Sequence, residues 1–354
     1  VSIRLDPGFW QGRRVFLTGH TGFKGAWLAL WLHRLGAQVT AFSLPPATEP
    51  SLFFQARIAE GIDSEYGDIR NLDLLTRALH RSAPSIVLHL AAQAIVAEGY
   101  RDPLGTFSTN LMGTLNLLAA MRDCKSIEAA VLVTSDKCYV PPDDSRALAE
   151  SDPLGGNDPY SASKACAEIA VHAWRASYVG GGPSIATVRA GNVIGGGDWS
   201  QHRLVPDLVR AFVADKPAAL RMPDAIRPWQ HVLDALGGYL QLAQCMSGRE
   251  GGDLSGAWNF GPDPSDATRV GDLAQRVAAM WGPNAQLVTV ANFQSETGCL
   301  RLDSSRARTL LGWRPKWSLT QGLVRTIDWY KAWVRGEDLR STSLAQLDEF
   351  MATA

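Results

Sequence analysis

The sequence predicts an α/β fold, built as a doubly wound parallel sheet with a smaller α/β lobe. Two observations lead to this prediction. Strand-like apolar runs alternate with helix-like stretches from Arg14 to Arg189. After Arg189, glycine and proline become frequent, and short predicted helices alternate with isolated strands. A length of 354 residues and a hydrophobic content of 46% are enough for two lobes and a sizeable core.

The first predicted strand is the apolar run Arg14–Thr18, and a helix follows it to about Leu35. The same alternation predicts strand 38–42, a third strand before Gly67, helix 72–79, strand 85–90, helix 106–121, strand 129–134, helix 158–178 and strand 184–189. Asp158-Pro159 suits a helix start, because aspartate caps helices and proline is tolerated at their first position. Strands that alternate with helices pair in parallel through right-handed crossovers.

The second half is expected to form mainly the smaller lobe. Helices are predicted near residues 203–214, 229–246, 270–280, 304–311 and 319–334. We place the domain boundary between residues 188 and 189, and we expect some later segments to return to the first domain. Residues 141–146 are predicted to form a loop insertion close to the site described below.

The composition argues against several classes of partner. The net charge is -1, so there is no basic excess for nucleic acid, and no apolar run approaches the roughly 18 residues of a membrane helix. Val1–Arg4 is not followed by the apolar core of a signal peptide, so we expect a cytoplasmic protein. The cysteines lack metal-ligand spacing, and we expect reduced thiols and no metal. They are Cys124, Cys138, Cys166, Cys245 and Cys299.

Three glycines lie three residues apart where the first predicted strand turns into a helix. Gly19 permits the tight turn, Gly22 lets backbone approach a pyrophosphate, and Gly25 allows close helix–strand packing. The helix N-terminus then offers free N–H groups to the phosphates. This predicts a Rossmann dinucleotide-binding domain over residues 1–188, with a substrate lobe after it. The loop residues predicted to bind the cofactor are Gly19, His20, Thr21, Gly22, Phe23, Lys24 and Gly25.

Other strand ends bear on the cofactor. Ser43 and Leu44 end the second strand, where neither a carboxylate nor an arginine stands, so NAD and NADP both stay open. Asp68 follows the third strand and either accepts from an adenine amine or caps the helix at Leu72. The small residues in Ala91-Ala92-Gln93 let a cofactor lie close to the backbone after the fourth strand.

Tyr160 and Lys164 are four apart, so they share one face of a helix. A lysine ammonium beside a phenol stabilises the phenolate, and we expect it to lower the pKa of Tyr160 toward working pH. Ser135 and Asp136 follow the apolar run Ala129–Thr134, which is predicted to be a buried strand. Active groups in open α/β sheets collect at such carboxyl ends. Tyr160 is therefore a candidate acid and base for a hydroxyl proton.

Two later segments are candidate site loops. Arg189–Trp199 leaves a strand through three glycines, and Asn192 is either a hydrogen-bonding residue or part of a simple loop. Arg227 and His231 are placed at a predicted helix start. Arg227 suits a bidentate phosphate contact, and the alternative for both residues is an ordinary ion pair or helix cap.

These motifs together resemble the extended short-chain dehydrogenase/reductase family, in its branch that modifies nucleotide sugars. The resemblance spans about residues 9 to 335. Ser135-Asp136-Lys137 is specific within the branch, because related dehydratases have Thr-Asp-Glu at this place. The segments that carry the resemblance are 18–25, 91–93, 134–139, the pair Tyr160 and Lys164, 189–199, 227–232, 257–262 and 302–303.

The resemblance implies a lyase that uses NAD to dehydrate CDP-D-glucose to CDP-4-keto-6-deoxy-D-glucose, in deoxysugar biosynthesis for O-antigen lipopolysaccharide. Tyr160 would remove the carbon-4 hydroxyl proton, with Ser135 on that oxygen. Asp136 would be the acid for the departing carbon-6 hydroxyl. Lys137 would be the base or an electrostatic partner at carbon 5. Lys164 would lower the Tyr160 pKa and hold the nicotinamide ribose.

The resemblance also implies further contacts and a homodimer. Additional cofactor residues would be Asp68, Ile69, Ala91, Ala92, Gln93, Thr134, Tyr160 and Lys164. The substrate residues would be Asn192, Arg203, Arg227 and His231. One alternative is a 4,6-dehydratase or epimerase that acts on another nucleotide sugar. A second alternative, a nicotinamide-binding sensor without catalysis, conflicts with the presence of both Tyr160 and Lys164.

The sequence departs from the family pattern in three places. Residues 140–150 lack an expected aromatic-rich stretch. Ala97 stands where arginine is usual, and Gly99 where serine is usual. The segment Glu296-Thr297-Gly298-Cys299 also differs. Because these changes fall at expected substrate loops, they bear on the identity of the sugar or the base.

Overall fold

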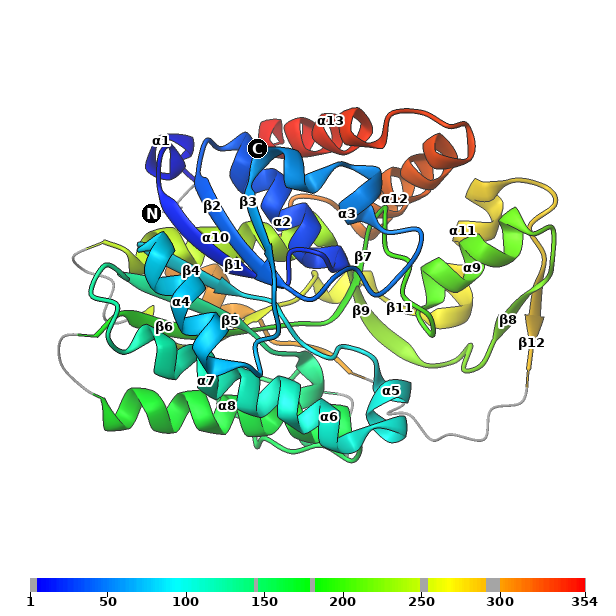
Figure 1. Cartoon of the computed structure of the whole chain (residues 1–354). Coiled ribbons are helices and arrows are strands. Elements are labelled where there is room, and N and C mark those ends of the chain that lie inside the picture. The colour runs from blue at the N-terminus through cyan, green and yellow to red at the C-terminus, as the bar shows by residue number, and fades with distance from the viewer. Residues whose placement is uncertain (1–4, 143–145, 179–181, 249–253, 291–299, 354) are drawn as a thin grey trace.

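A seven-stranded parallel sheet is the centre of the computed structural model (Figure 1). The structure describes residues 5–142, 146–178, 182–248, 254–290 and 300–353. The strand order is β10-β6-β5-β4-β1-β2-β3. The strands are β1 (Arg14–Thr18), β2 (Gln38–Ser43), β3 (Asp63–Tyr66), β4 (Ile86–His89), β5 (Ala129–Val133), β6 (Ser184–Ala190) and β10 (Gly256–Phe260). The predicted fold class is confirmed.

Helices cover both faces of this sheet, because its strands are apolar on both sides. Val15 and Leu17 of β1 belong to one apolar cluster, and Phe16 between them belongs to the other. The helices of the first face are α2 (Phe23–Arg34), α10 (Val232–Met246) and α13 (Leu339–Ala352). Those of the second face are α4 (Leu72–Ser82), α7 (Gly113–Met121) and α8 (Pro159–Ser177), seen below the sheet in Figure 1.

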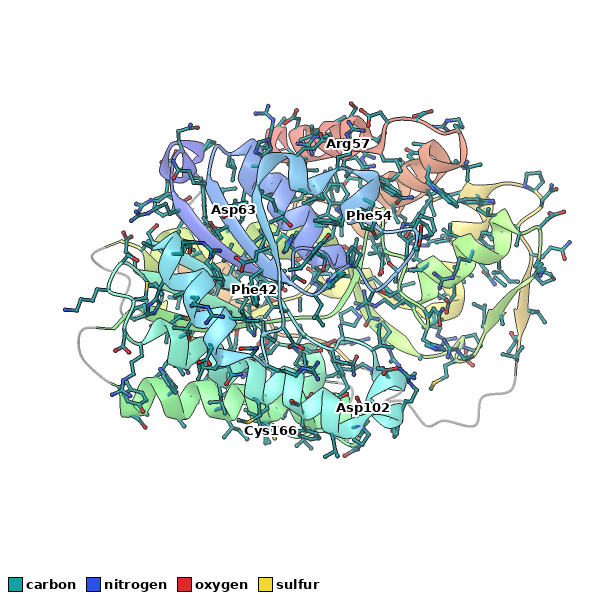
Figure 2. The ribbon with its side chains drawn as sticks, viewed as in Figure 1. Phe42, Phe54, Arg57, Asp63, Asp102 and Cys166 are labelled. Carbon is teal, nitrogen blue, oxygen red and sulfur yellow. The ribbon has the colours of Figure 1, made fainter. Side chains whose placement is uncertain are left out.

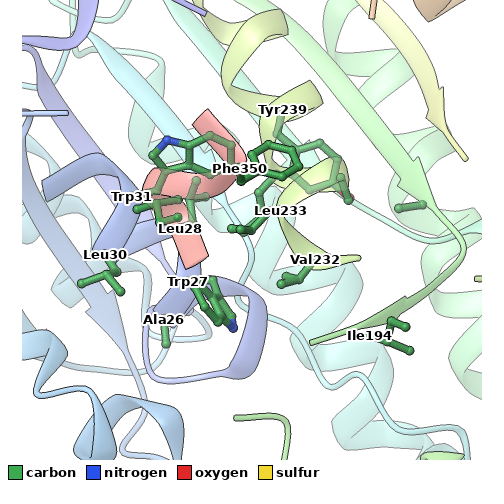
Figure 3. Packing of buried hydrophobic residues seen from close by; sticks show 14 of the residues in the cluster. Ala26, Trp27, Leu28, Leu30, Trp31, Ile194, Val232, Leu233, Tyr239 and Phe350 are labelled. Carbon is green, nitrogen blue, oxygen red and sulfur yellow. The ribbon is translucent and has the colours of Figure 1, made fainter. Parts of the chain in front are cut away.

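The larger of the two apolar clusters includes side chains from α2, α10 and α13 (Figure 3). Trp31 of α2 meets Phe350 of α13 edge to face, with ring centroids 5.5 Å apart. Trp27 is also fully buried, and its Nε1 donates to the Gly196 carbonyl at 2.9 Å. Outside the core, Arg57 reaches Asp338 at the start of α13 at 3.2 Å (Figure 2). The C-terminal helix α13 is therefore packed against α2.

The smaller lobe contains two short sheets with helices beside them, seen at the right of Figure 1. The first sheet has the order β11-β9-β7, and the second pairs β12 with β8. The strands are β7 (Asn192–Ile194), β8 (Ala218–Leu220), β9 (Ile226–His231), β11 (Ala267–Arg269) and β12 (Leu287–Thr289). The helices are α9 (Leu204–Val213), α11 (Val270–Trp281) and α12 (Leu319–Val334).

Short helical elements complete the described chain. They are α1 (Pro7–Trp10), α3 (Leu52–Gln55), η1 (Ile58–Gly61), α5 (Val96–Arg101), α6 (Pro103–Phe107), η2 (Ser108–Met112), η3 (Asp136–Cys138), η5 (Pro264–Asp266) and η6 (Ala307–Leu311). Among the residues that the structure describes, no helix has both the length and the apolar character needed to cross a bilayer.

One predicted helix begins too early. Residues 229–231 belong to β9, and α10 begins only at Val232, with His231 as its N-cap. The local sequence suits a helix, but β9 pairs with β7 on one side and with β11 on the other. These ladders join residues far apart in the chain, and they override the local preference. The strand β10, which follows residue 189, pairs with β6, while the domain boundary at 188/189 stays a prediction.

Candidate active site

The glycine loop between β1 and α2 is shaped by close backbone contacts. Gly19 has a φ of +83°, and a Cβ atom there would lie 2.5 Å from the Ala91 nitrogen. A Cβ on Gly25 would lie 2.0 Å from the Gly19 carbonyl oxygen. Gly22 is the N-cap of α2 and is open, since its Cβ would meet only that oxygen, at 3.5 Å. The loop therefore leaves room beside Gly22 and free N–H groups, which fits a dinucleotide pyrophosphate.

Hydroxyl groups surround the loop at the ends of β2 and β3. Thr21 Oγ1 donates to the Leu44 carbonyl at 2.8 Å, so Ser43 Oγ donates to Thr21 at 2.8 Å. His20 Nε2 lies 2.7 Å from Ser64 Oγ, and burial lowers the pKa of this imidazole to about 4. The His20 ring is fully buried beside Ser64 and Phe53, and its predicted cofactor contact stays a prediction.

Asp68 and Ile69 behave differently from each other. Asp68 pairs with Arg70 at 2.6 Å, which lowers the pKa of its carboxyl, and the N-cap of α4 is Asn71. The helix-cap alternative for Asp68 is therefore wrong, while its adenine contact stays a prediction. Asp68, Arg70 and Asn71 line an open cavity of about 540 Å³. Ile69 is buried, and a Cβ on Gly113 would lie 2.5 Å from its Cδ1, so only its backbone is available to a cofactor.

The side chain of Gln93 holds its own loop together after β4. Its Nε2 donates to Thr106 at 2.9 Å, and its Oε1 accepts from the Ile95 nitrogen at 2.5 Å. Asn110 braces this loop, since it accepts from the Gln93 nitrogen and donates to the Gln93 carbonyl and to Ser163 Oγ, each at 2.9 Å. Gln93 thus positions Ala91 and Ala92, whose backbone lies against Gly19 at Ala91.

Asn110 is a residue that the motifs missed. It is buried on the π-helical turn η2, which interrupts the helical stretch that the sequence predicted over 106–121. Such π turns occur often at functional sites. The available signal was one of two asparagines, Asn110 and Asn116, in a stretch that is otherwise largely apolar, and the partners Gln93 and Ser163 could not be inferred from it.

Ser135 organises the turn η3 at the carboxyl end of β5. Its Oγ donates to Asp136 Oδ1 at 3.1 Å and accepts from the Lys137 nitrogen at 3.2 Å. Asp136 is 5% exposed, and its Oδ2 has no hydrogen-bond partner among the described residues. Burial raises the pKa of Asp136, although the charge of Lys137 and the hydrogen bond from Ser135 oppose the rise. Asp136 is therefore suited to hold a proton.

Tyr160 and Lys164 are both buried on α8, as the spacing predicted. Burial raises the pKa of Tyr160 to about 12, against the lowering effect of a hydrogen bond with Ser135. The expected lowered Tyr160 pKa is thus wrong for this structure, because desolvation outweighs the favourable groups. Lys164 Nζ donates to the Val133 carbonyl at 3.3 Å, and burial lowers the pKa of this lysine to about 8.

Cations from three distant segments gather around this turn. Arg203 pairs with Asp198 at 2.9 Å. Burial lowers the pKa of Arg203, but the Asp198 carboxylate more than offsets this effect, so the pKa is raised. Arg227 is buried on β9, where its charge helps to stabilise ionised Asp136. Burial lowers the pKa of Lys24 to about 8, with the charges of Arg203 and Asp136 acting on it in opposite directions. Lys24 thus lies closer to the candidate acid than its place in the glycine loop suggested.

Two predicted substrate residues have different surroundings, and the substrate contacts of both stay predictions. His231 is 2% exposed and has Trp317 at a ring distance of 4.8 Å and Trp27 at 6.5 Å. Its Nδ1 accepts from the Leu233 nitrogen, and burial lowers its pKa to about 3, so it is a neutral core histidine and a helix cap. Asn192 opens β7 beside Trp229 of β9, and its substrate contact stays a prediction.

The Thr134 hydroxyl donates to Glu168 Oε1, and the predicted cofactor contact of this residue stays a prediction. Of the three sequence departures, the one at Gly99 can be placed directly. A Cβ on Gly99 would lie 3.1 Å from the Tyr160 nitrogen. Residues 143–145 and 291–299, which include Cys299 and the departure at 296–299, lie outside the described residues.

Comparison with known proteins decides the family. The sequence profile of the NAD dependent epimerase/dehydratase family matches residues 15–259. The chain belongs to this family. The resemblance to extended short-chain dehydrogenases/reductases is thereby confirmed.

Relatives of the chain include 4,6-dehydratases of two different nucleotide-linked glucoses. A CDP-glucose 4,6-dehydratase of Salmonella typhimurium is 44% identical over 98% of this chain and 99% of its own. A dTDP-glucose 4,6-dehydratase of Xanthomonas campestris is 26% identical over 76% of this chain and 80% of its own.

Solved structures of the epimerase/dehydratase family share the fold. A UDP-glucose 4-epimerase of Thermotoga maritima superposes with a TM-score of 0.80 at 20% identity, over 90% of this chain and 99% of its own. A dTDP-glucose 4,6-dehydratase of Bacillus anthracis, solved with NAD, gives 0.76 at 20% identity, over 90% and 97%. Across the described part of this family member, no group of three or more His, Cys, Asp or Glu is placed to hold a metal ion.

Proposed function

We propose that the chain is an NAD-dependent 4,6-dehydratase of CDP-D-glucose, with CDP-4-keto-6-deoxy-D-glucose as its product. The observation that carries this proposal is the η3 turn, which brings a buried acid, Asp136, and a lysine, Lys137, to the site of Tyr160. The 44% identity to a CDP-glucose 4,6-dehydratase supports this substrate over other nucleotide sugars.

The residues around the glycine loop fit the cofactor. The backbone of Gly19–Gly25 and the N-terminus of α2 would hold the pyrophosphate of NAD, and Lys164 its nicotinamide ribose. When bound, NAD supplies a hydride acceptor for carbon 4 and a hydride donor for carbon 6 of the sugar. Because Ser43 ends β2 without a carboxylate, the adenosine ribose would meet hydroxyl groups there.

Tyr160 would take the proton of the carbon-4 hydroxyl as that carbon is oxidised. Since burial raises the Tyr160 pKa to about 12, the phenolate needs help from Ser135 and from nearby cations. Ser135 would donate to the carbon-4 oxygen, and the guanidinium of Arg203 favours the phenolate. Lys164, whose pKa is about 8, would add its positive charge at neutral pH.

Elimination would then use the η3 turn. The carbon-4 ketone acidifies the proton on carbon 5, and Lys137 would accept that proton or stabilise the resulting negative charge. Asp136 would give a proton to the carbon-6 hydroxyl, which leaves as water. This assignment requires a protonated carboxyl, and burial favours one by raising the Asp136 pKa. A 4-epimerase needs no acid at this place, so Asp136 favours the dehydratase.

The test is mass spectrometry of the product formed from CDP-glucose in deuterated water. A product lighter by one water, with one solvent deuterium at carbon 5, is expected. Water loss only from another nucleotide-linked glucose would mean that the base assignment is wrong. A product of unchanged sugar mass would favour an epimerase, and no turnover with any nucleotide sugar would favour the sensor.

We further propose a cytoplasmic homodimer that serves deoxysugar biosynthesis. Large apolar side chains are exposed on the helices around α8: Leu104 is 83% exposed, Met112 49% and Ile169 55%. Exposed apolar side chains on neighbouring helices support a subunit interface there. Light scattering of the wild type and of Ile169→Asp checks this, and a monomeric wild type would contradict it.

A further inference from the structure

A buried ion pair lies directly beneath the candidate site. Glu168 of α8 and Arg189 of β6 have side chains that are each 3% exposed, and they share two hydrogen bonds, at 2.9 and 2.7 Å. Thr187 donates to the same carboxylate at 2.7 Å. Such pairs add little net stability, since their desolvation offsets their attraction, and apolar pairs of similar volume often replace them without loss. The burial of the Glu168–Arg189 pair is therefore not explained by a gain in stability.

The pair contacts both ends of the catalytic turn. At the start of the turn, the Thr134 hydroxyl donates to Glu168. At its end, Arg189 Nη1 donates to the Tyr139 hydroxyl at 2.7 Å, and the guanidinium lies over the tyrosine ring at 4.7 Å. Tyr139 in turn donates to Asn259 of β10 at 2.8 Å. The three candidate catalytic residues of the turn lie between these two anchors.

The same pair lies one helical turn from Lys164. Glu168 follows Lys164 by four residues on α8, so both side chains share one face of the helix. The charge of Glu168 opposes the loss of the lysine proton that burial promotes. Other groups act on Lys164 as well: Cys138 on η3, His89 on β4 and Lys24 on α2.

We propose that Glu168 and Arg189 are positioning residues for the dehydration: they fix the turn 134–139 against the helix that carries Tyr160 and Lys164. The proposal rests on the proposed function for its kinetic readout only. Loss of the pair would leave the catalytic groups present but displaced, and a displacement of about 1 Å can reduce the rate roughly a hundredfold.

A second cavity offers a direct test. It has a volume of about 590 Å³, and its lining includes Glu168, Arg189, Arg175 and Arg306. A small cation in solution could therefore replace a deleted guanidinium. For Arg189→Ala we expect kcat to fall by roughly ten- to a hundredfold with KM changed far less, and methylguanidinium to restore part of it. Arg175→Ala, which changes the same cavity but not the turn, should keep its kcat with or without methylguanidinium.

A second readout does not depend on catalysis. Amide hydrogen exchange of residues 134–139 should be faster in Arg189→Ala and slow again with methylguanidinium. Normal kcat in Arg189→Ala, or slow exchange despite a reduced kcat, would overturn the proposal. If the wild type dehydrates no nucleotide sugar, the proposed function fails, and the exchange experiment still decides whether the pair holds the turn.

A paired substitution covers a folding defect. Arg189→Ala leaves Glu168 buried without its partner, which is strongly destabilising in many proteins. The double variant Glu168→Gln with Arg189→Met removes both charges of this pair. We expect this variant to fold and to have a reduced kcat. For Glu168→Gln alone, the alkaline limb of the pH–rate profile should move to lower pH, because Lys164 loses a stabilising carboxylate. Full kcat in the paired variant would show that the ion pair is merely structural.

Discussion

Gly99 lies against the first turn of α8: a Cβ atom built on it would be 3.1 Å from the Tyr160 nitrogen and 3.3 Å from the Tyr160 Cβ. This contact is closer than ordinary van der Waals packing, so a side chain at this position would press on the residue proposed to move the substrate proton. The family pattern has serine here. A serine at this position would require the neighbouring atoms to move by a few tenths of an ångström.

We expect Gly99→Ser to reduce kcat by several fold with only a small loss of stability. The neighbouring backbone must shift by a few tenths of an ångström, which moves Tyr160 but leaves the core intact. Steady-state kinetics and thermal unfolding measure both effects. Gly248→Ala is the control, since its Cβ would meet only the Cys245 carbonyl, at 3.5 Å. An unchanged kcat in Gly99→Ser would show that α5 moves and that α8, with Tyr160, stays in place.

Two substitutions in the glycine loop should separate an effect on folding from an effect on NAD binding. Gly25→Ala forces a Cβ to within 2.0 Å of the Gly19 carbonyl, and we expect a loss of stability of about 1–3 kcal/mol together with loss of NAD binding. Gly22→Ala meets nothing closer than 3.5 Å, so it should fold normally and bind NAD at least tenfold more weakly. Calorimetric titration and thermal unfolding distinguish the two. Equal NAD affinity in Gly22→Ala would place the pyrophosphate elsewhere.

Tyr160→Phe should stop oxidation at carbon 4 while NAD still binds. The hydroxyl that takes the substrate proton is removed, and general-base catalysis is worth about 10²–10⁴-fold. The absorbance of reduced nicotinamide in a single turnover reports this step. Undiminished turnover would remove Tyr160 from the mechanism.

Asp136→Asn should slow elimination by roughly 10²–10³-fold and leave carbon-4 oxidation in place, because only the proton donor for the carbon-6 hydroxyl is lost. The 4-keto sugar that still carries oxygen at carbon 6 should then accumulate, as mass spectrometry would show. If oxidation and elimination disappear together, Asp136 serves the structure of the η3 turn instead.

Asp234 predicts how stability depends on pH. Burial raises its pKa to about 7, above the unfolded value, so the folded state retains a proton that the unfolded chain releases. Stability is therefore lost as the pH rises from about 4 to about 7, by about 4 kcal/mol at most. Asn at this position would still accept from the Lys316 nitrogen, which lies 2.6 Å from Asp234 Oδ1.

Asp234→Asn should therefore be more stable than the wild type at about pH 8 and nearly equal to it at about pH 4. Denaturant unfolding at both pH values measures the difference. Asp328→Asn, at an exposed position of α12, is the control. A constant stability difference between the two pH values would mean that Asp234 is ionised in the folded protein.

Local patterns predicted most of the first domain because its signals are local. Apolar runs such as Ala129–Val133 and the glycine turn at Gly19 each lie within a few residues, and the structure has the strand and the turn where they were expected. The spacing of Tyr160 and Lys164 likewise placed both on one helix. Burial could not be read from this spacing, and burial decides that the Tyr160 pKa is raised.

Most of the features that the local patterns did not reveal depend on distant contacts, and the cap of α4 is a local exception. His231 looked like a ligand at a helix start, but Trp317 and Trp27 enclose it, and neither is near it in sequence. The Thr134 hydroxyl has Glu168 as its partner, on a helix far along the chain. Asp68 is matched by Arg70 only two residues away, yet Asn71 supplies the cap that was expected of it.

The position of β10 at the edge of the sheet has a consequence for synthesis of the protein. β6 is complete at Ala190, but its neighbour β10 is not made until Phe260. At ribosomal speeds this delay is on the order of several seconds, during which the outer edge of β6 has unpaired N–H and C=O groups. An open strand edge in a nascent chain can pair with other chains, so this stretch of translation is one in which aggregation is favoured.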